Sequence, residues 1–206
     1  MRNTLFLIAV ILSFSACTTY QYVTFDSSGL QKDKQQLLTL ENDTMRVAYS
    51  FSGPGGNVTL TVFNKTSQPI YLDWTRSSLI RNDQSFTLRR RDTEIIPPQT
   101  SISDVMLNLN DEGGGIPRLN IPDSAHSRKY HYPSGGWIKY KAVDYTEAGS
   151  PIRLKAWLTF LFGPGGSTDL TMTHSFYIGE VMHSGVYAGG FGPYHDPGDM
   201  LYVWYQ

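Results

Sequence analysis

The clearest pattern in the chain is an alternation of apolar and polar residues in two neighbouring segments. Residues 45–51 carry apolar side chains at every second position, and residues 58–62 repeat this alternation. A period of two is typical of a strand with one buried face. Residues 53–56, Gly-Pro-Gly-Gly, lie between the two segments, and glycine tolerates the positive φ that tight turns require. The two segments therefore predict an antiparallel hairpin.

Further short strands are predicted along most of the remaining chain. They cover residues 70–74, 77–81, 85–88, 102–109, 137–143, 152–162, 170–181 and 201–205. Residues rich in Gly, Pro, Asn and Ser separate these segments, as turns do. About nine or ten short strands with frequent turns favour an all-β fold, namely an immunoglobulin-like β-sandwich. A barrel is the alternative.

The segment at residues 70–74 also predicts a core position for a tryptophan. In this segment Ile70, Leu72 and Trp74 alternate with Tyr71 and Asp73. Alternate residues of a strand share one face, so these three apolar side chains are expected to face the core. A buried tryptophan needs an acceptor for its indole N–H, and we expect a backbone carbonyl to supply it. A binding-surface tryptophan is the alternative.

The N-terminus has the three parts of an export signal. Arg2 provides the positive charge, and residues 5–14 form an apolar run that is too short to span a bilayer. Small residues follow, and residues 14–17, Phe-Ser-Ala-Cys, resemble the lipobox of bacterial lipoproteins, with Phe14 in place of the usual Leu. This resemblance implies that residues 1–16 are removed and that Cys17 carries the lipid.

The cysteine count agrees with this interpretation. Cys17 is the only cysteine, so the chain can form no internal disulfide, and a thioether to lipid accounts for the single thiol. Several acyl chains would hold the protein firmly to a membrane. Thr18 stands where an Asp retains many lipoproteins at the inner membrane, which favours the outer membrane. Residues 18–22 lack acidic side chains, which favours its periplasmic face.

The domain organisation follows from the signal and the strands. Residues 1–16 are predicted to be the signal peptide, residues 17–40 the lipidated cysteine and a polar tether, and residues 41–206 the β-sandwich domain. A short helix near residues 30–40 is the alternative to tether in that segment. Residues 111–133 are rich in Gly, Pro, Asn and Ser and predict one long loop.

The charge balance argues against nucleic acid as a partner. The formal net charge is −1, and charged residues make up 17% of the chain. Nucleic-acid binding draws on a basic excess that neutralises phosphates, and none exists here. Arg89, Arg90 and Arg91 form one short basic run, which we interpret as a solvated loop or strand edge. A contact site for an anionic partner is the alternative.

Several stretches together resemble a group of uncharacterised lipoproteins of Bacteroidota. These stretches are residues 20–23 (Tyr-Gln-Tyr-Val), 41–44 (Glu-Asn-Asp-Thr), 64–66 (Asn-Lys-Thr), 69–74 (Pro-Ile-Tyr-Leu-Asp-Trp), 77–80 (Ser-Ser-Leu-Ile), 96–98 (Ile-Pro-Pro) and 150–153 (Ser-Pro-Ile-Arg). The resemblance covers most of the chain after Cys17. It implies an envelope location and an immunoglobulin-like sandwich, and it transfers no site residue.

Two segments contain oxygen or nitrogen ligands at close spacing. His195, Asp196 and Asp199 fall within one Pro-Gly turn, which is also ordinary turn composition. Residues 108–113 partly match the first half of an EF-hand loop, but the required glutamate falls on Leu119. The motifs HExxH and GxSxG are absent, and the remaining histidines are scattered. We therefore predict no catalytic residue, no metal and no cofactor.

The aromatic residues near the C-terminus are the best candidates for a binding surface. Tyr187, Phe191, Tyr194 and Trp204 are interleaved with glycines, and aromatic faces are common anchors in protein and glycan recognition. Their alternative role is the core face of a last strand. The sequence thus predicts a non-enzymatic lipoprotein that docks on an envelope protein, with glycan binding as the alternative and a hydrolase as the least favoured function.

Overall fold

The computed structural model describes residues 18–86, 88, 92–110, 115–122, 124–132, 134–163, 167–195 and 200–205, without the side chain of His195. This part of the chain is all-β, with only three short 3₁₀ helices: η1 (Glu147–Gly149), η2 (Ala188–Gly190) and η3 (Gly192–His195). It contains no helix that is long and apolar enough to cross a membrane. The signal at residues 1–16, Cys17, residues 89–91 and residues 196–199 lie outside the described residues.

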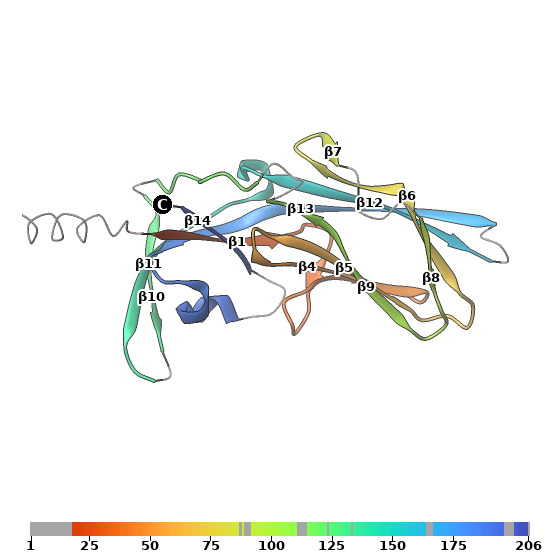
Figure 1. The fold of residues 1–206 in the computed structure, drawn as a ribbon, viewed down its shortest axis with the longest axis horizontal. Helices are drawn as coiled ribbons and strands as arrows, with labels where there is room; N and C mark the ends of the chain where they lie inside the picture. Colours follow the sequence, from red (N-terminus) through yellow and green to blue (C-terminus); the bar gives the residue numbers. More distant parts are fainter. Residues whose placement is uncertain are drawn as a thin grey trace, which may run out of the picture.

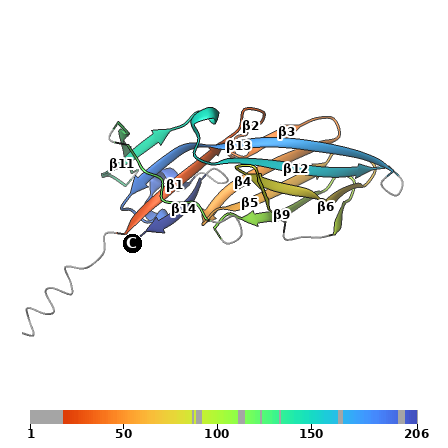
Figure 2. The same cartoon turned by 90° about the horizontal axis from the view of Figure 1, so that it is seen from above.

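The strands form two layers that are consistent with a β-sandwich (Figures 1 and 2). One layer has the order β14-β1-β13-β12-β6-β7, and β8 also pairs with β6. Its strands are β14 (Met200–Tyr205), β1 (Thr19–Asp26), β13 (Thr168–Ser184), β12 (Arg153–Phe162), β6 (Ile70–Arg81), β7 (Gln84–Phe86) and β8 (Thr93–Ile96).

The second layer is antiparallel and has the order β2-β3-β4-β5-β9. Its strands are β2 (Gln31–Lys32), β3 (Leu38–Glu41), β4 (Met45–Pro54), β5 (Asn57–Asn64) and β9 (Ser101–Asn108). A short parallel pairing of β14 with the end of β4 joins the two layers, with Leu201 opposite Gly53 and Tyr202 opposite Pro54. The sheet hydrogen bonding is therefore continuous from one layer to the other.

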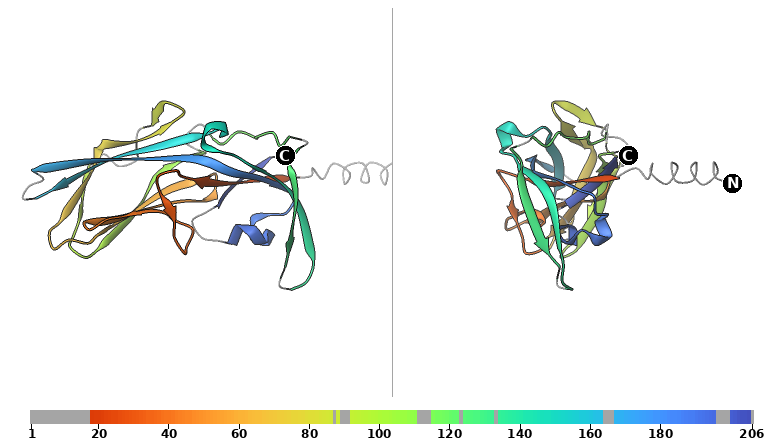
Figure 3. Two further views of the ribbon diagram at one scale, coloured as in Figure 1. Left: turned by 180° about the vertical axis from the view of Figure 1, so that it is seen from behind. Right: turned by 90° about the vertical axis from the view of Figure 1, so that its left-hand side faces the viewer.

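Strand β13 is the central strand at the end of the molecule where β1 begins. Its first half pairs with β12, and its last residues pair with β1 on one edge and with β11 (Trp137–Asp144) on the other. Strand β11 in turn pairs with β10 (His126–His131), and this hairpin projects from the same end (Figure 3). Three segments that are far apart in sequence thus meet around residues 180–184.

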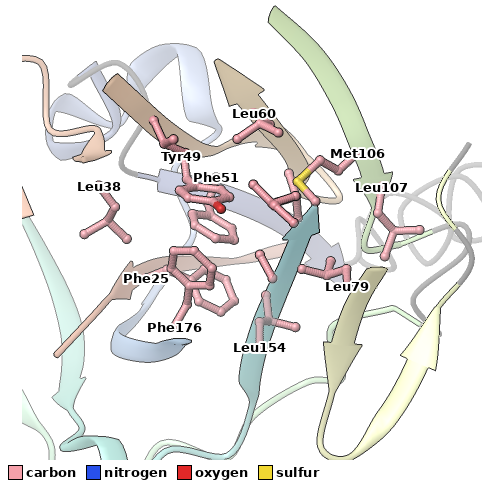
Figure 4. Packing of buried hydrophobic residues seen from close by; sticks show 14 of the residues in the cluster. Phe25, Leu38, Tyr49, Phe51, Leu60, Leu79, Met106, Leu107, Leu154 and Phe176 are labelled. Atoms are coloured by element: carbon pink, nitrogen blue, oxygen red, sulfur yellow. The ribbon is translucent and has the colours of Figure 1, made fainter. Parts of the chain in front are cut away.

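The core between the layers is largely aromatic and aliphatic (Figure 4). Phe25 of β1 stacks on Phe51 of β4 with ring centroids 4.5 Å apart, and Phe51 contacts Phe176 of β13 at 5.1 Å. Trp74 is buried as predicted. Its indole N–H donates to the Glu94 carboxylate at 3.0 Å, whereas a backbone acceptor was predicted.

The predicted hairpin is confirmed. Strands β4 and β5 are antiparallel, with Tyr49 opposite Leu60. Residues 70–74 and 77–81 were predicted as two strands but form the single strand β6, whose pairing with β12 shifts register between Trp157 and Thr159. The described residues contain fourteen strands rather than the nine or ten predicted.

The predicted tether at residues 17–40 is wrong for most of its length. Thr19–Asp26 forms strand β1 in the interior of a layer, and the predicted short helix near residues 30–40 is replaced by β2 and β3. Gln21 and Thr24 are buried together with the apolar residues of β1. Both faces of this strand are covered, so it lacks the alternation that marks a half-exposed strand.

The predicted long loop at residues 111–133 is also wrong in part. Residues 126–131 form strand β10, in which charged and histidine side chains surround a single tyrosine. Residues 115–122 have no regular secondary structure, and they pack against β1 and β14. Residues 115–122 therefore cover this part of the sheet.

Candidate binding surface at the aromatic end of the sheet

Four aromatic side chains share one face of the β1–β14 pair. Tyr20 lies opposite Trp204, and Tyr22 lies opposite Tyr202. Directly paired residues of neighbouring strands point to the same face, so the four rings are side by side. The sequence pointed to Trp204 but missed Tyr20 and Tyr22. Their spacing of two residues in Tyr-Gln-Tyr-Val was the available signal.

The turn of chain that holds η2 and η3 folds over the inner part of this face. Phe191 is fully buried and stacks on Tyr22, with ring centroids 4.1 Å apart and an interplanar angle of 20°. The edge of Tyr140 from the β10–β11 hairpin meets the Phe191 ring at 5.3 Å. The Tyr22 hydroxyl donates to the Val186 carbonyl at 2.6 Å, and burial raises the pKa of this phenol.

These contacts make a second, smaller core. Its buried members are Tyr22, Ala142, Met182, Ala188, Phe191, Met200 and Tyr202. Phe191 was predicted as a binding residue, and this assignment is corrected here because its ring is not accessible from outside. Tyr194, another predicted binding residue, is half-buried with its ring 5.2 Å from Tyr202.

Tyr187 and Trp204, by contrast, remain exposed, with 57% and 56% of their surface accessible. The ring of Tyr187 meets Tyr20 at 5.7 Å and Tyr202 at 6.2 Å, both edge to face. Tyr202 and Trp204 are 6.4 Å apart and tilted by 41°. Tyr20, Tyr187, Tyr202 and Trp204 are called the aromatic patch below. Its rings are inclined to one another, so the patch is stepped rather than flat.

The opposite face of the same strands is held by hydrogen bonds. Gln21 is buried, and its side-chain amide donates to the Pro117 carbonyl at 3.1 Å and accepts from the Leu119 N–H at 2.7 Å. The Tyr205 hydroxyl donates to the Ile116 carbonyl at 2.8 Å. These hydrogen bonds hold the Gln21 face of β1 and β14 in place, so the two strands support the exposed rings on the opposite face.

A histidine belongs to this covered face. His183 Nε2 lies 3.2 Å from Gln21 Oε1. Burial lowers the pKa of His183, and the nearby Arg118 guanidinium lowers it further. The neutral imidazole is thus favoured, and the residue serves the packing between β13 and residues 115–122.

The other candidate ligand residues that the structure describes do not come together in a metal site. Within the described residues, no group of three His, Cys, Asp or Glu side chains is placed to hold a metal ion. The ligand oxygens of Asp196 and Asp199 lie outside the described residues, as does the His195 imidazole. Asn108 of the partial EF-hand match donates to Asn57 across the β5–β9 pair at 2.7 Å, and Leu119 packs against the main core.

One further histidine is buried far from the aromatic patch. His174 Nδ1 lies 2.7 Å from the Tyr49 hydroxyl inside the sandwich. Burial lowers the pKa of His174 and raises that of Tyr49. Each of these two polar side chains gives the other a hydrogen-bond partner in an apolar environment. We therefore assign the pair a structural role.

Known proteins were compared with this chain in three ways. No family model, no curated protein and no solved structure matches it.

Proposed function

We propose that this chain is a lipoprotein held by Cys17 in the outer membrane, with its domain on the periplasmic side. In this proposal the domain is an immunoglobulin-like β-sandwich that binds an envelope protein and performs no catalysis. The observation that carries the proposal is the position of the aromatic patch. Tyr20 belongs to β1, which begins at Thr19, the second residue after Cys17.

This position limits how far the patch can be from the membrane. An extended chain spans at most about 3.6 Å per residue, so Cys17 and Tyr20 are separated by on the order of 10 Å. A lipid on Cys17 would therefore hold the patch beside the bilayer surface. The protein partner is accordingly one that is embedded in the membrane or lies on it.

The chemistry of the patch supports a protein contact. Tyrosine and tryptophan are enriched among the residues that dominate protein–protein binding energy, because large, stiff rings bury much area. Tyr187 and Trp204 each expose more than half of their surface, and the supporting rings beneath them are packed. The two exposed side chains are thus pre-positioned for a partner.

Glycan binding is the second candidate, and the exposure of the same two rings favours it. Sugars stack on accessible aromatic faces, and each of these rings offers one. The inclination between neighbouring rings, 87° for Tyr187 and Tyr202, argues against one extended platform for a polysaccharide. A short glycan on a single ring is the form that this alternative takes.

The test is affinity purification from crosslinked envelopes with three forms of the full chain. They are the unaltered protein, the double variant Tyr187→Ala/Trp204→Ala and the control Trp157→Ala. Trp157 is also exposed, at 44%, but lies on β12 away from the patch. We expect a discrete protein that is recovered with the first and third forms and lost with the double variant.

Equal recovery with all three forms would contradict a role of the aromatic patch. If no protein is recovered with any form, and envelope glycans instead retain the unaltered protein but not the double variant, the glycan alternative replaces the proposal.

A further inference from the structure

The β10–β11 hairpin has two faces of different chemistry. Its inward face carries Tyr130, Ile138 and Tyr140, which are half-buried, and Tyr140 packs on Phe191 in the smaller core. The hairpin is fastened there by the Tyr132 hydroxyl, which donates to the Gly190 carbonyl. This face explains why the hairpin is attached to the rest of the domain.

The outward face is basic. Lys129 lies directly opposite Lys139, and Ser127 lies opposite Lys141. All three lysines are exposed. Like charges that face each other across a strand pair disfavour the pairing, so this arrangement does not stabilise the hairpin.

The acidic groups near the hairpin are engaged elsewhere. Asp144 accepts two hydrogen bonds from Arg128, at 2.9 and 3.0 Å, and Arg128 also pairs with Glu180. By the alternation of the strands, Arg128 and Asp144 belong to the inward face. Asp144 and Glu180 are thus paired with Arg128 on the inward face, away from the lysines of the outward face.

The same outward face carries an exposed tryptophan. Trp137 lies opposite His131, and their rings meet at 4.6 Å. The indole is 64% accessible, the most exposed of the large apolar side chains in the described chain. Tryptophan next to lysine is the combination found where proteins meet the headgroup region of a bilayer.

The hairpin lies at the end of the molecule where β1 begins (Figure 3). Lys141 pairs with His183 on one edge of β13, and Gln21 of β1 pairs with the same His183 on the other edge. The basic face is therefore close to the point at which residues 1–17 enter the domain.

We propose that the outward face of the β10–β11 hairpin, formed by Lys129, His131, Trp137, Lys139 and Lys141, rests on a membrane surface of anionic phospholipids. This proposal rests on the lipid anchor at Cys17, which brings the hairpin to the bilayer. The lysines bind the phosphate headgroups, because a negative surface potential attracts basic segments within a Debye length. Trp137 enters the interface, and the contact fixes the orientation of the sandwich relative to the membrane.

The test uses the mature lipidated protein, residues 17–206, reconstituted into vesicles of phosphatidylethanolamine and phosphatidylglycerol that contain brominated lipids. Bromine quenches tryptophan fluorescence only at close approach. The measurement is made in a Trp204→Phe background, because Trp204 is also exposed and lies near the anchor. In this background we expect the quenched fraction of the emission to be largely lost in Trp137→Phe and retained in the matched control Trp157→Phe. The triple variant Lys129→Gln/Lys139→Gln/Lys141→Gln should lose at least half of the Trp137 quenching. The unaltered protein should lose as much when the vesicles consist of neutral phosphatidylcholine.

Circular dichroism of the triple variant serves as the folding control, because it changes only exposed side chains. The inference is overturned if the protein floats with the vesicles and Trp137→Phe leaves the quenching unchanged. It is also overturned if the lysine variant keeps its quenching but loses a crosslinked protein, which would assign the face to an acidic protein partner. Protein that does not float with the vesicles would overturn both the anchor and this inference.

Discussion

Truncation of Phe191 tests whether this ring belongs to the smaller core or to the exposed aromatic surface. We expect Phe191→Ala to destabilise the domain strongly, although the residue belongs to a glycine-rich segment near the C-terminus. The matched control is Tyr187→Ala, four residues earlier, whose ring is mostly exposed. Removing it should cost about 0.5–1.5 kcal/mol, well below the loss for Phe191→Ala, because it ends two edge contacts, with Tyr20 and Tyr202, but opens no cavity in a core.

The magnitude for Phe191 follows from its contacts. Its ring is fully buried, and burying a phenylalanine side chain contributes about 1.5–3 kcal/mol. The stacked contact with Tyr22 and the edge contact with Tyr140 each add about 0.5–1.5 kcal/mol. These contributions overlap, and measured losses for Phe→Ala in cores are about 3–5 kcal/mol, which we take as the expected range.

The assay is urea unfolding followed by far-UV circular dichroism, with the slope of the transition compared between variants. In a domain of this size such a loss corresponds to a decrease in Tm of about 6–20 °C. If Phe191→Ala costs less than about 1 kcal/mol, the turn that holds η2 and η3 is not packed on β1. The assignment of Phe191 to a core would then be refuted.

Three further predictions concern the core and the hairpin. Asn64→Ala should cost about 2–4 kcal/mol in urea unfolding, because the buried Asn64 amide donates to the carbonyls of Gln68, Ile96 and Pro97 and these acceptors would lose their donor. Burial lowers the pKa of His174 below its ordinary 6.5, so the unfolded state binds the proton more readily. The contribution of His174 to the free energy of unfolding should therefore be fully present above about pH 6.5 and should decrease as the pH falls to 5. This decrease should be smaller in His174→Gln, and an equal decrease in both proteins would refute the burial of a neutral His174. Gly192→Ala should reduce hydrogen-exchange protection in β10 relative to Gly185→Ala, because a Cβ at Gly192 would overlap the Tyr130 ring whereas Gly185 has open space around it.

The sequence predicted those strands that bury one face and expose the other. Strands β4 and β5 come nearest to this kind, with one face buried and the other mostly half-buried, and the alternation of their sequence is visible directly. Strand β1 is covered on both faces and uses Gln21 as a buried polar group that binds residues 115–122. A buried glutamine with long-range partners leaves no local pattern, so this strand was predicted as a polar tether.

The candidate site was predictable only in outline. The density of aromatic residues near the C-terminus pointed to the correct end of the domain. Which rings are buried depends on the fold of residues 186–195 over β1, a contact between segments separated by most of the chain. Strand β10 was missed for a related reason, because its single half-buried tyrosine gains its role only from Gly192 and the smaller core.

The lipid anchor at Cys17 is tested by mass spectrometry of the N-terminal peptide from protein isolated from bacterial membranes. We expect residues 1–16 to be absent and Cys17 to carry a diacylglyceryl thioether and an N-acyl chain. We also expect Cys17→Ala to abolish this modification and to release the protein from the membrane fraction. An unmodified Cys17, or a chain that retains residues 1–16 in the mature protein, would contradict the account.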